Sequence, residues 1–202
     1  SKLNFSQHYN ARRVNNIYLD TINLENYFDN IEGNNNRKKL RIRWYGDLFG
    51  NIKNPKIELK NKHSEVGYKS IRDFRSFNFN DIFDLNTLLN KTIYQDYFNN
   101  LDFKSYLPVL LNTYERKYFI SFDKKIRLTL DKNLKFYSLL DKNNSFLDCR
   151  QLEDTKIMEL KYDIQINKIV DSLTNYLPFR IKKFSKYVHG VSIFREDKRF
   201  ID

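Results

Sequence analysis

The stretch from Arg37 to Tyr45 alternates between charged and apolar side chains. In an extended strand, successive side chains point to opposite faces. One face therefore carries Arg37, Lys39, Arg41, Arg43 and Tyr45, and the other carries Lys38, Leu40, Ile42 and Trp44. This alternation predicts a strand with one basic face and one largely apolar face.

The same two-residue period recurs along much of the chain, and in three further segments the polar positions again carry long charged side chains. It predicts further strands at Val14–Leu19, Lys56–His63, Gly67–Ile71, Val109–Ser121, Lys125–Lys132, Leu134–Leu140 and Lys156–Ile166. Three carboxylates, Glu58, Asp131 and Glu159, are interspersed among the cations of these faces. The repeated pattern suggests that several charged faces point toward one another inside a closed sheet.

Helical spacing of apolar residues appears in fewer places. Asp20 and Thr21 provide a cap for a predicted helix at Ile22–Asn30, residues 80–104 form the main helical insert, and Lys168–Tyr176 form a last helix. Ser1–Arg13 and Asp141–Glu153 are predicted to be irregular, and Phe179–Ile193 form a basic, aromatic tail. Strands outnumber helices and mostly follow one another. We therefore expect an α+β fold with an antiparallel sheet, in a single domain over residues 1–202.

The net charge of the chain indicates which class of ligand it binds. The formal net charge is +11, which indicates a polyanionic ligand such as nucleic acid, acidic lipid, nucleotide or polyphosphate. The single cysteine, Cys149, cannot form an intramolecular disulfide, which fits a reducing compartment. The chain has no apolar run of about 18 residues, and its first residues are polar. We expect a soluble, cytoplasmic protein.

Standard catalytic motifs are absent from the sequence. It contains neither a P-loop nor a G-x-G-x-x-G turn, its three histidines are scattered, and Cys149 has no base near it in sequence. The charged strands remain as the candidate chemistry. Two like charges ~4 Å apart repel by about 4 kcal/mol at an effective dielectric constant near 20, so converging cations need anions between them. A bound oligophosphate provides such anions, and the carboxylates could then bind Mg²⁺ or Mn²⁺.

Periodicity alone leaves another interpretation open. A half-exposed antiparallel sheet also alternates charged and apolar side chains, with cross-strand Lys–Glu pairs at its surface. The concentration of long cations in Arg-x-Arg and Glu-x-Lys sequences favours the enclosed site.

Six ordered motifs resemble those of a known family. They are residues 13–21 (RVNNIYLDT), 41–46 (RIRWYG), 58–62 (ELKNK), 114–116 (YER), 159–161 (ELK) and 183–187 (KFSKY). They resemble the VTC (vacuolar transporter chaperone) domain of the polyphosphate polymerase type, in the triphosphate tunnel metalloenzyme superfamily. The resemblance runs in the family's order from about residue 5 to about residue 195.

This resemblance implies a tunnel of antiparallel strands, with helices packed outside, that binds ATP and inorganic polyphosphate. It implies transfer of the ATP γ-phosphate onto growing polyphosphate, release of ADP, and use of Mn²⁺ or Mg²⁺. The catalytic cations would be Arg41, Arg43, Lys60, Arg116, Arg127, Lys183 and Lys186. Lys69, Tyr114 and Ser185 would bind phosphate, Glu159 would hold the metal, and the strand pattern adds Lys62 and Lys161.

The family pattern usually includes a further strand and a helix before the position of Arg13, so we expect a barrel that lacks its first strand. Alternative activities are a triphosphatase or nucleotide cyclase of the same superfamily, or a polyphosphate- or nucleotide-binding module without turnover. Nucleic acid is not expected as a partner, because the aromatic residues fall mostly on the apolar faces of strands. Membrane tethering is expected only through a partner or a region outside this sequence.

Overall fold

The computed structural model describes residues 4–64, 66–80, 98, 105–140, 149–166, 170 and 181–198. Its main element is an eight-stranded antiparallel sheet in the order β10-β8-β7-β1-β2-β4-β5, with β9 paired to β8 beside this path. The strands are β1 (Phe5–Thr21), β2 (Asn36–Tyr45), β4 (Lys56–His63), β5 (Val66–Asp73), β7 (Tyr106–Ser121), β8 (Ile126–Ser138), β9 (Cys149–Leu152) and β10 (Ile157–Tyr162). Two short strands, β3 (Gly50–Ile52) and β6 (Phe77–Phe79), form a separate pair.

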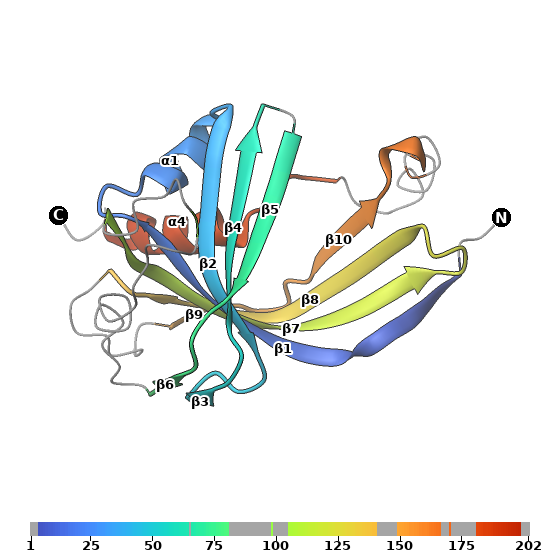
Figure 1. Ribbon diagram of the computed structural model, residues 1–202, viewed down its shortest axis with the longest axis horizontal. Helices are drawn as coiled ribbons and strands as arrows, with labels where there is room; N and C mark the ends of the chain where they lie inside the picture. The colour runs from blue at the N-terminus through green and yellow to red at the C-terminus, as the bar shows by residue number, and fades with distance from the viewer. Residues whose placement is uncertain are drawn as a thin grey trace.

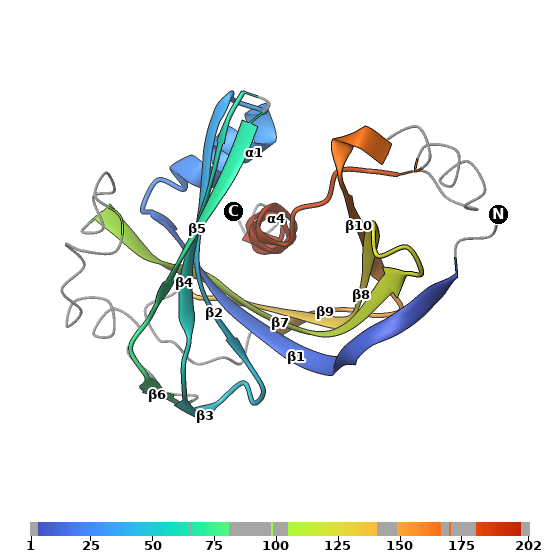
Figure 2. The same cartoon turned by 45° about the vertical axis from the view of Figure 1, so that its right-hand side comes forward.

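The large sheet is strongly curved, and the helix α4 (Lys186–Lys198) lies inside the curve (Figures 1 and 2). The edge strands are β5 and β10, and no pairing within the described residues joins them. The sheet therefore has the tunnel-like wall implied by the resemblance, but the wall is not closed by strand pairing. The side that faces α4 is called the concave face below, and the other side the convex face.

The convex face is covered by the β3–β6 pair. Apolar residues of β1, β2 and β4 pack there against Ile52 and the three phenylalanines Phe74, Phe77 and Phe79. Trp44 is 2% exposed and contacts Phe77 and Phe79 edge to face. The apolar half of the β2 alternation is therefore buried, as its pattern predicts.

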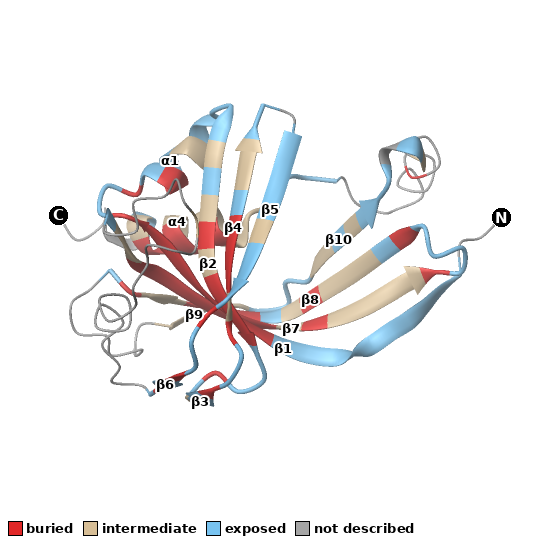
Figure 3. Cartoon of the chain, in the orientation of Figure 1, coloured by how far each residue is buried: buried red, intermediate tan, exposed pale blue. Residues whose placement is uncertain are grey.

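The concave face is covered by α4 and by α1 (Glu25–Glu32). Tyr187, Val191 and Phe194 of α4 belong to a buried cluster that also contains Leu110 and Phe136 of the sheet. Gly190 allows the helix to come close, because a Cβ atom there would lie 2.6 Å from atoms of both Leu110 and Phe136. Figure 3 shows that burial is concentrated beneath these helices, while residues 4–13 of the chain are exposed.

A buried carboxylate joins the two helices to the sheet. Asp20 is 0% exposed and accepts hydrogen bonds from the backbone amides of Asn26 and Tyr27 in the first turn of α1. The same carboxylate accepts a hydrogen bond from the Tyr187 hydroxyl of α4. Burial and the neighbouring Asp20 raise the pKa of Tyr187, so this hydroxyl stays protonated.

Most predicted elements are confirmed, and β4 has the predicted bounds. The structure corrects the prediction in four places. β1 begins at Phe5, earlier than predicted. Both faces of its first half are exposed, so no alternation of apolar residues marks this part of the strand in the sequence. The predicted strands Lys125–Lys132 and Leu134–Leu140 are one strand, β8, and the loop predicted at Asp141–Glu153 contains β9. The tail forms α4.

β8 contains a bulge, and because of this bulge the sequence pattern does not predict one continuous strand. Its register against β7 shifts by one residue between Lys132 and Lys135, and Asn133 lies there with a positive φ of 56°. The extra residue reverses the alternation, so that Asp131 and Leu134 both face the concave side. In the sequence, such a reversal resembles a break between two strands.

Two predictions fall outside the residues that the structure describes, namely most of the helical insert at 80–104 and most of the helix at Lys168–Tyr176. Among the described helices, none is both long enough and apolar enough to cross a membrane.

Candidate functional site

Charged side chains of six strands meet on the concave face. Residues directly opposite each other in paired strands share a face, and the register pairs Arg41 with Glu58, and Arg116 with Asp131. Glu159 of β10 lies opposite Thr129 of β8 on the same side. The charged side chains that the alternation predicted on one face are therefore brought together, but on a sheet that strand pairing does not close. Their cations come from β2, β4, β5, β7, β8, β10 and α4.

Glu58 is the centre of the first cluster. Its carboxylate accepts a hydrogen bond from Arg41 Nε at 2.7 Å and forms an ion pair with Lys69 Nζ at 2.8 Å. Arg43 Nη1 lies 3.9 Å from the same carboxylate. Three cations from β2 and β5 thus surround one nearly buried acid of β4. This group is called the Glu58 cluster.

The pKa of Glu58 reflects these neighbours. Burial alone would raise it, but the positive charges of Arg41, Arg43 and Lys69 outweigh burial and lower the pKa of Glu58 to about 2. The acid is therefore ionised throughout the physiological range, and the cluster keeps an excess of positive charge.

Asp131 is the centre of the second cluster. Arg116 donates two hydrogen bonds to its carboxylate, at 2.6 and 2.7 Å, and Lys186 of α4 lies 2.6 Å away. The ring of Tyr114 lies beside both cations, 5.3 Å from Arg116 Cζ and 4.8 Å from Lys186 Nζ. Asp131 is fully buried, so its charge is acceptable only because it is paired. This group is called the Asp131 cluster.

Arg43 is held between the two clusters by neutral groups. Its Nε donates to Asn16 Oδ1 at 2.7 Å, and its Nη2 donates to the Tyr114 hydroxyl at 3.4 Å. Asn16 in turn donates to Asn112 at 2.8 Å. Both asparagines are 0% exposed, so the arginine is oriented by a buried polar network that spans β1, β2 and β7.

A groove of lysines continues from the Glu58 cluster toward the start of β2. Its cavity measures about 650 Å³, and its lining includes Lys39, Lys60, Lys62 and Lys183, with Ser185 just before α4 and Glu196 as the one carboxylate. Lys39 Nζ donates to Ser185 Oγ at 2.8 Å. Ser185 Oγ also accepts a hydrogen bond from the backbone amide of Val188 at 3.3 Å, so Ser185 is the N-cap of α4. These four lysines and Ser185 are called the lysine groove.

Crowding changes the protonation of one lysine. Burial and the nearby charges of Arg41 and Lys60 lower the pKa of Lys39 to about 8. A bound anion would oppose this effect, because it favours the charged form of the ammonium group. The groove thus contains a cation whose charge depends on whether an anion is present.

The remaining predicted residues lie at the exposed end of the concave face. Arg127 of β8 is exposed and lies opposite Lys161 of β10. Glu159, with 45% of its side chain exposed, lies 3.5 Å from Lys161 Nζ and 3.8 Å from Arg116 Nη2. Glu159 therefore links Lys161 to Arg116 of the Asp131 cluster, and Arg127 lies beside them in the register.

The surroundings of Glu159 are compatible with a divalent metal. The hydroxyl of Thr129, opposite Glu159, is buried and has no hydrogen-bond partner in the described part of the chain. No group of three or more acidic, histidine or cysteine ligands occurs among the described residues. Mg²⁺ and Mn²⁺ are often bound by one or two carboxylates together with substrate phosphates, so this donor set fits a metal that arrives with its substrate.

The structure adds residues that the sequence analysis did not assign. Lys39 belongs to the same alternation as Arg41 and could have been included on that basis. Asn16 and Arg12 become visible only through the register of β1 against β2 and β7. Glu58 and Asp131 also act as internal counter-ions, so part of the repulsion among the cations is relieved by the protein itself.

Comparisons with known proteins agree with the motifs. A profile of the VTC domain family matches residues 2–195, which is most of the chain. No curated protein matches it. Among solved structures, a putative adenylyl cyclase from Hippeastrum, described as having a dominant triphosphatase activity, has a TM-score of 0.44 and 14% identity, covering 95% of this chain and 85% of that one. The family match confirms the resemblance to this family, and the chain belongs to the VTC domain family.

Proposed function

We propose that this protein is a metal-dependent polyphosphate polymerase, which transfers the γ-phosphoryl group of ATP to the end of a polyphosphate chain and releases ADP. The family and the cationic concave face support a triphosphate tunnel enzyme. The polymerase activity is supported by the length of the row of cations on this face.

The observation that carries the proposal is the continuity of the cations. The Asp131 cluster, Arg43, the Glu58 cluster and the lysine groove follow one another along the concave face, and the groove adds a cavity of about 650 Å³. A triphosphatase needs to hold one triphosphate. The additional lysines provide counter-charges for a polyanion longer than three phosphates, which is what a polymerase must hold beside its nucleotide.

At the end of the concave face away from the lysine groove, aromatic rings surround an arginine. Arg12 lies 5.3 Å from the ring centre of Tyr9 and 5.8 Å from those of Tyr45 and Tyr118. Tyr9 and Tyr45 are 48% and 51% exposed, and Arg12 is the register neighbour of Arg116. Aromatic and guanidinium faces stack well on bases, so we assign the nucleoside of ATP to this end and polyphosphate to the lysine groove.

The transfer itself requires mainly alignment and charge stabilisation. A terminal phosphate oxygen of the acceptor forms a bond to the γ-phosphorus, and the bond from that phosphorus to the β,γ-bridging oxygen breaks. In this scheme, Arg41, Arg43 and Arg116 would donate hydrogen bonds to the oxygens of the transferred group and its neighbours. Their side chains are pre-oriented by Glu58, Asn16 and Asp131.

No side-chain nucleophile is needed for this scheme. Cys149 lies opposite Tyr137 on the convex face, away from the cations of the concave face. Glu159 and Thr129 are the groups that would hold a divalent metal. Bound there, a divalent ion would supply positive charge that offsets the negative charge of the substrate phosphates. Direct transfer between phosphates is thus the chemistry that the arrangement supports.

The test is to identify the products formed from γ-labelled ATP in the presence of Mn²⁺. The proposal predicts ADP and labelled polyphosphate of increasing length on a gel. Free phosphate as the sole labelled product would indicate a triphosphatase, and pyrophosphate with a cyclic nucleotide would indicate a cyclase. Tight binding of ATP without any product would leave a binding module, and each of these three results would refute the polymerase.

A further inference from the structure

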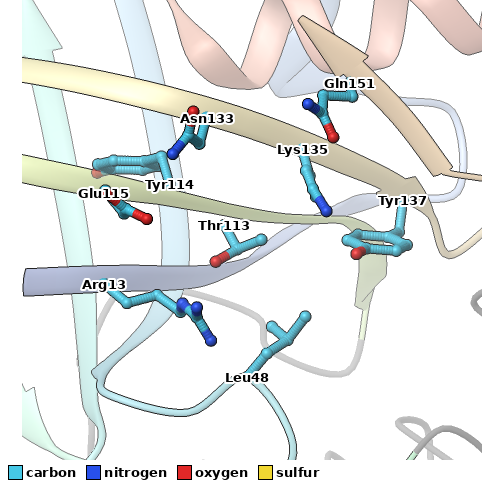
Figure 4. Close-up of a pocket in the computed structure, with 9 residues that line it drawn as sticks. All are labelled: Arg13, Leu48, Thr113, Tyr114, Glu115, Asn133, Lys135, Tyr137 and Gln151. Atoms are coloured by element: carbon cyan, nitrogen blue, oxygen red, sulfur yellow. The ribbon is translucent and has the colours of Figure 1, made fainter. Parts of the chain in front are cut away.

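A second cavity lies on the convex face, on the opposite side of the sheet from the cations described above. It measures about 310 Å³ and is formed over β1, β7, β8 and β9. Figure 4 shows Arg13, Thr113, Lys135 and Tyr137 projecting into it from the adjacent strands β1, β7 and β8, with Leu48 at one side. The sheet itself separates this outer pocket from the concave face.

The outer pocket has an excess of positive charge. Arg13 and Lys135 both line it, and neither side chain forms an ion pair within the described part of the chain. Glu115 is the one carboxylate among the lining residues, and its Oε2 lies 3.0 Å from Lys132 Nζ. The two cations therefore face a cavity whose lone acid is paired directly with Lys132 and only at longer range with Arg13, its register neighbour.

Among the neutral groups of the outer pocket, Gln151 can provide hydrogen-bond donors. The hydroxyl of Thr113 donates to Asn15 at 2.6 Å, so its proton is already used. Gln151, opposite Lys135 in the register, brings an amide group. Burial and the neighbouring Cys149 raise the pKa of Tyr137 to about 12, so this side chain stays neutral and adds no negative charge at physiological pH.

We propose that the outer pocket is a second anion site, which takes a single phosphate group, either free or as a monoester. A guanidinium fork and an ammonium group on opposite sides of the cavity match the charge of a phosphate dianion. The pocket is less than half as large as the lysine groove and lacks its row of lysines. One phosphate group, rather than a chain, is therefore the ligand that fits.

The test follows backbone amide signals of ¹⁵N-labelled full-length protein during a titration with inorganic phosphate, at constant ionic strength. The site predicts saturable shifts for Arg13, Thr113, Lys135 and Gln151 on the convex face. A parallel titration with glycerol 3-phosphate distinguishes the two sources of the group: shifts in both titrations indicate a site that accepts monoesters, and shifts with free phosphate alone indicate an inorganic phosphate site.

The variants Arg13→Gln and Lys135→Gln should each weaken the convex-face binding by about tenfold, because each removes one charge-assisted contact. Shifts of Arg43 and Lys60 on the concave face should be unchanged in both variants, which also shows that the variants are folded. Convex-face shifts that are absent in the wild type, or that persist unchanged in both variants, would overturn the proposal. Either result is independent of the proposed polymerase activity.

Discussion

The ammonium group of Lys186, the first residue of α4, lies 2.6 Å from the carboxylate of Asp131 on β8. A cation at the N-terminal end of a helix is unfavourable for the helix dipole, so the acid stabilises an otherwise poor position. The pair fixes the beginning of α4 against the sheet. It also places Lys186 beside Arg116 and Tyr114, where we propose that phosphates bind.

Removal of this contact should affect both stability and activity. Lys186→Met should lower the free energy of unfolding by about 1–3 kcal/mol, because Asp131 loses one charged partner but retains Arg116. It should also abolish polymer formation. Urea unfolding and a polyphosphate gel measure the two effects. The exposed Lys182, replaced in the same way, is the matched control, and equal behaviour of the two variants would show that the Lys186 contact is unimportant.

Glu58→Gln should make the fold depend on bound anions. Without this carboxylate, Arg41, Arg43 and Lys69 repel one another without an internal counter-ion. The melting temperature should fall in phosphate-free buffer, and tripolyphosphate should restore more of it than it adds to the wild type. The exposed Asp73, replaced by Asn, serves as control. A variant that melts like the wild type and gains no more from tripolyphosphate would refute the role of Glu58 as counter-ion.

Lys39 predicts a pH dependence of anion binding. Its pKa of about 8 in the free protein lies below its unfolded value, so burying its charge costs stability below pH 8 and this cost disappears as the pH rises toward 10.5. A bound polyanion should raise the pKa again. Binding should therefore take up a proton between about pH 8 and 10, and the affinity should fall by up to about tenfold per pH unit there.

Calorimetry of tripolyphosphate binding in buffers of different ionisation enthalpy measures this proton uptake. The uptake should disappear in Lys39→Met. The same proton uptake in the wild type and in the variant would assign the effect to another group.

Gly190→Ala tests the position of α4. In an isolated helix this change is favourable by about 1 kcal/mol. Here the new Cβ would meet Leu110 and Phe136 at 2.6 Å, so we expect a net loss of about 1–3 kcal/mol in the free energy of unfolding. Gly67→Ala is the control, since its Cβ would lie 3.6 Å from the nearest atom. Stabilisation by Gly190→Ala would show that α4 does not pack into the curve of the sheet.

The alternation of residues determined which parts of this fold could be predicted. β2 and β4 each have one apolar and one charged face, and both strands were predicted closely. The bulge at Asn133 reverses the alternation of β8 and made one strand look like two. In α4, Tyr187, Val191 and Phe194 have helical spacing. This segment was nevertheless predicted as a basic, aromatic tail, because several basic residues come directly before the helix.

In the candidate site, too, some features could be predicted from the alternation and others could not. Arg41, Arg43 and Lys60 were found from their period, because a shared face follows from strand geometry alone. That Glu58 binds three cations, or that Asp131 reaches a helix more than fifty residues later in the chain, depends on register and tertiary packing. These relationships have no local sequence signal, so only the structure could provide them.

The central claim is that cations of several strands share one phosphate site on the concave face, and binding of tripolyphosphate tests it most directly. We predict that Arg43→Ala raises the dissociation constant measured by calorimetry by roughly ten- to a hundredfold, since it removes charge-assisted hydrogen bonds worth about 1.5–3 kcal/mol. The exposed Lys53, outside this face, should be replaceable by Ala with little change in affinity. Equal affinities for the wild type and both variants would contradict the account.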